Sequence, residues 1–121
     1  MLRPIPARIL RSTAIVEVCT GTDVYQEQEY AEAYTVRNVH VQPTARIVKS
    51  TNNTDEQLTA TLFVDCRRSS PDLDWRDLLT RAHDKGGDLR VTVRGIRYTV
   101  LTCDALRDDT DKLHHWEIGM R

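Results

Sequence analysis

Residues 89–101 read Leu-Arg-Val-Thr-Val-Arg-Gly-Ile-Arg-Tyr-Thr-Val-Leu, and this stretch decides the fold class. Apolar and polar residues alternate on both sides of Gly95, which predicts a tight β-hairpin with the glycine at its turn. After a charged link, residues 112–119 read Lys-Leu-His-His-Trp-Glu-Ile-Gly and predict a strand that returns to pair with the hairpin. Two joined strands and a returning third are typical of one half of a small barrel.

Three further strands are predicted outward from this stretch. Residues 14–19 are a run rich in β-branched side chains, and residues 58–66 show the clearest alternation in the chain. Residues 34–42 also alternate, but their apolar parity changes midway, which predicts a β-bulge near Asn38. We expect Pro43 to bend or end that strand, because proline cannot donate a ladder hydrogen bond.

A single helical stretch covers residues 72–83, with Ser70 or Asp72 as its N-cap and Gly86-Gly87 at its end. The elements together predict a mainly β protein. The expected fold is a small antiparallel β-barrel of six to seven strands, with one short α-helix at about 72–83 and long polar loops. Its 121 residues are expected to form one domain, 1–121.

Composition narrows the class of protein. The net charge is −1, so we expect no electrostatic footprint for nucleic acid, which would need a concentrated basic surface. Three widely spaced cysteines without a Cys-x-x-Cys pair favour a reduced, cytoplasmic protein over a disulfide scaffold. The first residues hold no long apolar run, so we expect neither a signal peptide nor a membrane span.

Four polar segments are candidates for contacts with other molecules. Residues 1–12 are expected to form an extended basic arm, and residues 21–32 a polar loop with exposed tyrosines. Residues 49–56 hold no hydrophobic side chain and are the clearest loop tip in the chain. The link at 104–111 is acidic, and it could meet the basic arm of another copy in an assembly.

The pair His114-His115 is the strongest candidate for a metal site. Adjacent side chains of a strand point to opposite faces, so we expect these two not to chelate one metal, and no spacing adds His40 or His83 to them. No serine lies in a Gly-x-Ser-x-Gly turn, and no glycine loop is built for phosphate. We expect no catalytic site, no cofactor and no metal.

The hairpin also invites a nucleic-acid interpretation. Arg90, Thr92 and Arg94 share one side of its first strand, and Arg97 follows on the next. Single-stranded nucleic acid needs aromatic platforms beside such cations, and Tyr98 has the parity of the opposite side. A solvated barrel face is therefore favoured.

Several segments resemble a known family. The opening 3–10, Arg-Pro-Ile-Pro-Ala-Arg-Ile-Leu, the segment 58–66 and the ending 112–119 resemble the small minor capsid proteins of tailed phages and prophages. The Gly87-Asp88 turn and the hairpin after it resemble the wider group of head-completion and stopper proteins. Residues 70–86 depart from this group, because the segment is longer and more helical than the short link expected there.

The resemblance implies a component of the phage neck, assembled in the host cytoplasm. Such a barrel forms a homo-oligomeric ring, of twelve-fold symmetry, between a portal or adaptor protein and a tail-side terminator or tube protein. A loop of the ring narrows the channel and retains packaged DNA without reading its sequence, and no membrane is involved. The channel-loop candidates are Lys49, Ser50, Thr51, Asn52, Asn53, Thr54, Asp55 and Glu56, with 21–32 as second choice. The interface candidates are Arg3, Arg8, Arg11, Tyr25, Tyr30, Asp108, Asp109 and Asp111.

Two other functions stay open from the residues alone. One is a free-standing small β-barrel that binds a ligand or a peptide strand. The other is a barrel that binds single-stranded nucleic acid.

Overall fold

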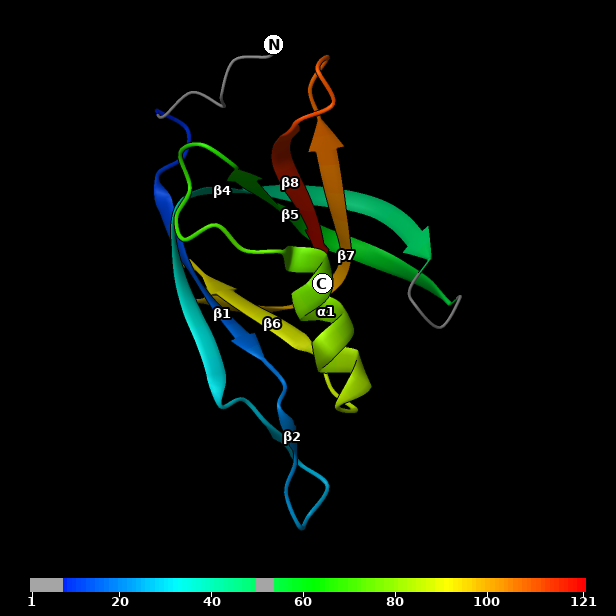
Figure 1. Ribbon diagram of the computed structural model, residues 1–121. Coiled ribbons are helices and arrows are strands. Elements are labelled where there is room, and N and C mark those ends of the chain that lie inside the picture. The colour runs from blue at the N-terminus through cyan, green and yellow to red at the C-terminus, as the bar shows by residue number, and fades with distance from the viewer. Residues whose placement is uncertain (1–7, 50–53) are drawn as a thin grey trace.

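The computed structural model describes residues 8–49 and 54–121 of the chain. Six antiparallel strands close into a barrel in the order β1-β4-β5-β8-β7-β6. A short two-stranded hairpin, β2-β3, projects from the barrel (Figure 1). The strands are β1 Ser12–Val18, β2 Gly21–Thr22, β3 Gln28–Glu29, β4 Glu32–Lys49, β5 Asp55–Asp65, β6 Leu89–Val93, β7 Ile96–Arg107 and β8 Leu113–Met120. The helix α1 spans Trp75–Asp84.

The predicted fold class is confirmed, and the structure adds detail to the hairpin that decided it. Strands β6 and β7 pair from Val93 and Ile96 back to Arg90 and Thr99, around Gly95 at φ +77°. A positive φ there suits glycine, which has no Cβ to clash. Strand β8 then pairs with both β5 and β7, so the chain's ending completes the barrel wall as predicted.

Strand β4 carries the predicted bulge. Ser12 pairs with Val39 and Ala14 with Val36, so three steps on β4 match two on β1. Asn38 lies inside this bulge at φ +60°. Of the two outcomes expected at Pro43, the strand does not end there: β4 runs on to Lys49, with a second register shift between Pro43 and Arg46.

The expected polar loop at 21–32 is also wrong in part. Residues 21–22 and 28–29 pair as a hairpin, and β4 already begins at Glu32. The turn is nucleated by Asp23, whose Oδ1 accepts hydrogen bonds from the backbone N–H groups of Tyr25 (2.8 Å) and Glu27 (2.9 Å). Side-chain turns of this kind leave no apolar period, so the pattern of hydrophobic residues could not reveal the hairpin.

Helix α1 begins three residues later than expected. Neither Ser70 nor Asp72 caps it; Asp74 does, accepting from the backbone N–H of Asp77 at 3.2 Å. The helix ends before Gly86 as predicted, with that glycine at φ +83°. No helix within the described ranges is long and apolar enough to cross a membrane.

The core fills the barrel and continues under the helix. Inward-facing residues such as Val16, Leu62 and Ile118 have no exposed surface. Helix α1 packs against β1, β6 and β7, and its Trp75 is fully buried in the same cluster. An ion pair on the surface also holds the helix, because Arg81 donates to both carboxylate oxygens of Glu32 on β4, at 2.8 and 2.9 Å.

Candidate functional site

The two ends of the predicted channel loop belong to strands. Lys49 ends β4, while Asp55 and Glu56 begin β5, so the loop is narrower than 49–56. Lys49 Nζ and Asp55 Oδ1 form an exposed ion pair at 2.7 Å, and Thr54 is exposed beside it. The remaining candidates lie outside the described residues; they are Ser50, Thr51, Asn52 and Asn53.

The β4-β5 hairpin extends beyond the barrel wall. The pairing of β4 with β1 ends at Val39, and the pairing of β5 with β8 ends at Ala60. From the cross-strand pair Arg46 and Leu58 to the tip, β4 and β5 pair only with each other. Figure 1 shows them running side by side to the edge of the molecule. Near the tip Ile47 has 68% of its surface exposed. The hairpin is therefore a ribbon with a polar end and one exposed apolar side chain.

The β2-β3 hairpin, which we call the finger, projects beyond the C-terminal end of β1 (Figure 1). Its tip presents Val24 and Tyr25, which are 88% and 81% exposed. Glu27 and Glu29 are exposed on its returning side, and neither forms an ion pair among the residues described. The finger is an acidic projection with an apolar tip.

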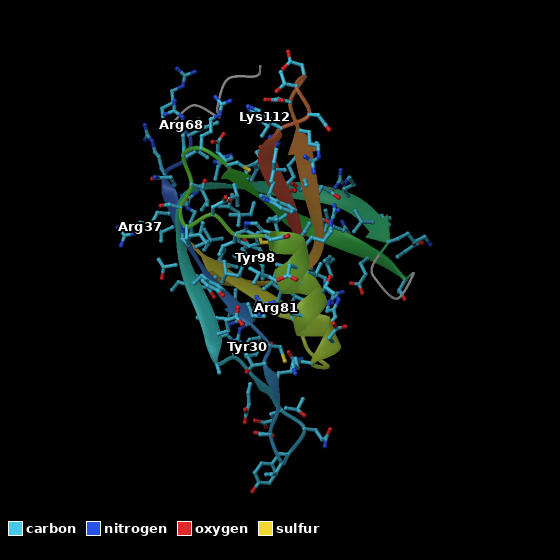
Figure 2. All side chains as sticks on the ribbon, viewed as in Figure 1. Tyr30, Arg37, Arg68, Arg81, Tyr98 and Lys112 are labelled. Carbon is cyan, nitrogen blue, oxygen red and sulfur yellow. The ribbon has the colours of Figure 1, made fainter. Side chains whose placement is uncertain are left out.

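Tyr30 lies at the base of the finger and is half-buried, not exposed as expected. The Arg90 guanidinium lies 3.8 Å from its ring centre, a cation–π contact, and Tyr30 packs against the core cluster. Figure 2 labels Tyr30 where the finger joins the barrel. Burial raises the pKa of Tyr30, although nearby Arg90 opposes the shift. Tyr30 thus joins the finger to the barrel.

The same contact corrects the interpretation of the hairpin face. An aromatic partner does lie beside Arg90, and it comes from residue 30 and not from the hairpin itself. Arg90 is already paired, however, since its Nε and Nη2 donate to the Glu17 carboxylate at 3.2 and 3.1 Å. A cation held by a carboxylate is a poor phosphate ligand, so this face does not favour nucleic acid.

The base of the finger is also fastened by Gln28. Its Oε1 accepts from the backbone N–H of Asp88 at 3.0 Å and from the Tyr30 hydroxyl at 2.5 Å. Gly87 lies against it, and a Cβ at that position would come within 2.6 Å of Gln28 Oε1 and 2.8 Å of Cys19 Cβ. Close packing therefore holds the finger in a defined place.

A basic cleft lies at the start of β1. It has a volume of about 560 Å³ and includes Arg8, Arg11 and Arg94 in its lining. All three arginines are exposed, and none forms an ion pair among the residues described. The structure thus brings two arm residues together with one from the β6-β7 turn. Arg3 lies outside the described residues.

An apolar groove of about 270 Å³ adjoins this cleft and shares Ile9 and His40 with it. Its floor is a row of rings on three strands: His40 and Phe63 have centroids 5.8 Å apart, and Phe63 and His115 are 6.4 Å apart. His40 and Phe63 are direct cross-strand partners, so they share the outer face of the barrel. Ile9 forms part of the lining and is 43% exposed.

The expectation that His114 and His115 point apart is wrong. Their Nδ1 atoms are 2.7 Å apart, and the ring planes are nearly perpendicular. The register explains it, because the partners of Leu106 and Arg107 are His115 and Leu113, so β8 has one extra residue at His114. His115 Nε2 also contacts Glu117 Oε2 at 2.9 Å. Within the described ranges, no group of three or more metal-ligating side chains is arranged to hold a metal.

The acidic link is shorter than the expected 104–111, because β7 runs to Arg107 and only residues 108–112 form a tight turn before β8. Asp108 Oδ1 accepts from the backbone N–H groups of Thr110 (2.8 Å) and Lys112 (3.1 Å) and from the Thr110 hydroxyl (2.7 Å). These bonds, the Thr110 side chain first, lower the pKa of Asp108 to about 2. The Asp108 carboxylate is thus hydrogen-bonded within its own turn, whereas Asp109 and Asp111 are exposed.

The three cysteines are free thiols. Burial raises the pKa of Cys103 to about 12 and that of Cys66 to about 11. Both thiols therefore stay protonated at neutral pH, and a protonated thiol is a weak nucleophile.

The basic cleft and the aromatic groove, as assembled surfaces, were missed from the sequence. The residues that meet there come from positions 9, 40, 63 and 115, and no periodicity links segments so far apart. One signal was available: Phe63 is the single apolar residue on the polar parity of the strand 58–66. Strand alternation places an aromatic side chain at such a position on the outer face of the barrel.

Comparison with known protein families identifies a match. The sequence model of a family described as minor capsid protein matches residues 6–120, nearly the whole chain. No curated protein matches it.

Proposed function

We propose that this chain, which belongs to the minor capsid protein family, forms a ring at the joint between the phage head and tail. Membership of that family makes it a structural protein of the phage particle. The finer proposal is that copies of the barrel bridge the portal or adaptor and the tail-side terminator or tube, and that they act by assembly and not by catalysis.

The observation that carries this proposal is that two hairpins leave one closed barrel. A closed barrel has no unpaired strand edge in its wall, so its contacts with neighbours must be made by side chains or by projections. The finger and the β4-β5 ribbon are such projections, and they leave the barrel at different places. This form suits a repeated wall element that touches several partners.

We assign the channel side to the β4-β5 ribbon. Its described tip residues Lys49, Thr54 and Asp55 are polar and exposed, and the two charges neutralise each other in an ion pair. A neutral, polar tip blocks DNA by its bulk without holding the phosphates tightly. Retention of packaged DNA would then depend on the length of the ribbon.

The test is a phage in which the ribbon is shortened. Val48 and Glu56 are cross-strand partners, so a two-residue Asn-Gly turn can replace residues 49–55 and close the hairpin at that pair. We expect the variant to fold and enter particles, and we expect heads to lose DNA. The readouts are electron microscopy of full and empty heads and the amount of this protein per particle.

A matched control keeps the ribbon's length and changes its charge. Exchanging the two charges in Lys49→Asp with Asp55→Lys preserves the ion pair, and heads should stay full. Removing the whole protein should give heads that neither join tails nor keep DNA. Normal, infectious particles without this protein would overturn the proposal, and full heads with the shortened ribbon would overturn the role of its tip.

A further inference from the structure

We infer that copies of this chain bind one another head to tail, with Tyr25 of one finger seated in the aromatic groove of the next copy. The acidic side of that finger lies against the basic cleft beside the groove. The inference deepens the proposed function and rests on it, because it names the contact that would join neighbouring subunits of the ring.

The groove has the chemistry to accept a tyrosine. Its floor consists of the His40, Phe63 and His115 rings, and its volume of about 270 Å³ is on the scale of one aromatic side chain. Aromatic pairs prefer offset or tilted contacts, which a row of rings offers at several positions. Gln42 also lines the groove and gives a polar partner for the tyrosine hydroxyl.

The finger is built to present that tyrosine. Tyr25 is 81% exposed at the tip, yet its own backbone N–H is fixed by Asp23 Oδ1 at 2.8 Å. At the base, Gln28 Oε1 is bonded to the backbone N–H of Asp88 on the barrel. The backbone that carries Tyr25 is therefore already ordered, which lowers the entropic cost of docking.

The charges on the two surfaces are complementary. Glu27 and Glu29 on the finger and Arg8, Arg11 and Arg94 around the cleft all lack an ion-pair partner among the described residues. The cleft adjoins the groove through Ile9 and His40, so one finger can reach both. Docking would pair charges that the isolated barrel leaves unpaired, and it would set the register of the contact.

The positions of the two surfaces require a second copy. The groove lies at the start of β1 and the finger follows its end, and seven strand residues at about 3.3 Å each separate them by roughly 20 Å. A finger therefore cannot reach its own groove. Contacts between unlike surfaces form a ring when the rotation per subunit closes and a filament when it does not.

Charge reversal with mixing tests the pairing. One variant carries Glu27→Arg and Glu29→Arg on the finger, and the other carries Arg11→Glu and Arg94→Glu at the cleft. We expect each alone to associate at least about tenfold more weakly than wild type, because like charges then meet. An equimolar mixture should recover wild-type association, since every interface then pairs opposite charges. Mass photometry and sedimentation velocity measure it.

Photocrosslinking locates the contact even when association is weak. A benzoylphenylalanine replaces Tyr25, and isotope-labelled and unlabelled copies are mixed so that bonds between copies are recognised by mass. We expect crosslinks between copies to the peptides that contain His40, Phe63 or His115, both in concentrated protein and in phage particles. The same probe in place of Ile47, which is exposed at 68% on the ribbon, should not label those peptides.

The outcomes separate this inference from the proposed function. If the protein is found in particles but position 25 crosslinks elsewhere, to another protein or not at all, the head-to-tail contact is wrong and the neck role stands. If the protein is absent from particles, the neck role fails, and crosslinking of the concentrated protein alone decides the contact. A mixture of reversed variants that stays as dissociated as its parts also contradicts the inference.

Discussion

The barrel wall and the finger use the same strand geometry for opposite purposes. In the wall strands β1 and β6, alternate side chains such as Val16 and Val91 are buried in one shared core. In the finger, two short strands bury nothing of their own, and the hairpin keeps its shape through Asp23 in the turn and Gln28 at the base. The contrast teaches that apolar burial stabilises the wall, whereas a few polar bonds and close contacts place the projection.

The largest expected effect falls on the core that the wall shares with α1. Trp75→Ala removes a fully buried indole that ties α1 to the barrel core, and such truncations cost about 3–5 kcal/mol. Urea unfolding followed by circular dichroism measures the free energy of unfolding. Tyr25→Ala is the matched aromatic truncation on the finger, and it should change that energy by less than about 0.5 kcal/mol. Similar losses of unfolding free energy in both variants would contradict the distinction between the core and the finger.

An intermediate effect is expected where the two regions meet. Gly87→Ala places a Cβ against Cys19 and Gln28, so it should cost about 1–3 kcal/mol and loosen the finger. Amide hydrogen exchange should speed up in residues 21–31 more than in β6 or β8. Gln28→Ala removes the Oε1 that the new Cβ would meet, together with its hydrogen bonds to Asp88 and Tyr30. The double variant should cost less than the two single losses added together, because that clash is then absent. If the losses of unfolding free energy were strictly additive, Gln28 would not contact the new Cβ.

The smallest effect concerns the other turn that a side chain organises, at Asp108. Its pKa is lowered from 3.8 to about 2 by hydrogen bonds made in the folded turn. A carboxyl with a lowered folded pKa contributes stability above its unfolded pKa, and that stability is lost as the pH falls from 3.8 towards 2. Unfolding between pH 5 and 2 measures this slope, and Asp108→Asn should flatten it. Asp111→Asn is the control, and an equal flattening there would contradict the assignment.

The sequence alone predicted most of the wall. Period-two alternation places side chains on two faces wherever a strand forms, so the hairpin around Gly95, the strand 58–66 and the bulge at Asn38 could all be predicted. The polar tip near 49–56 was also visible, because it depends only on local composition. The helix was found but its start was misplaced, since any of three polar residues could have capped it.

The surfaces were decided by tertiary structure. Register and bulges determine which distant residues meet, and one extra residue in β8 turns His114 and His115 together where alternation predicts them apart. Closure of the barrel likewise brings Ile9 beside His40 and Phe63, and it places Tyr30 over Arg90. Those contacts join residues that no local pattern connects. Local alternation therefore determined the barrel, and only its closure decided the groove, the basic cleft and the position of the finger.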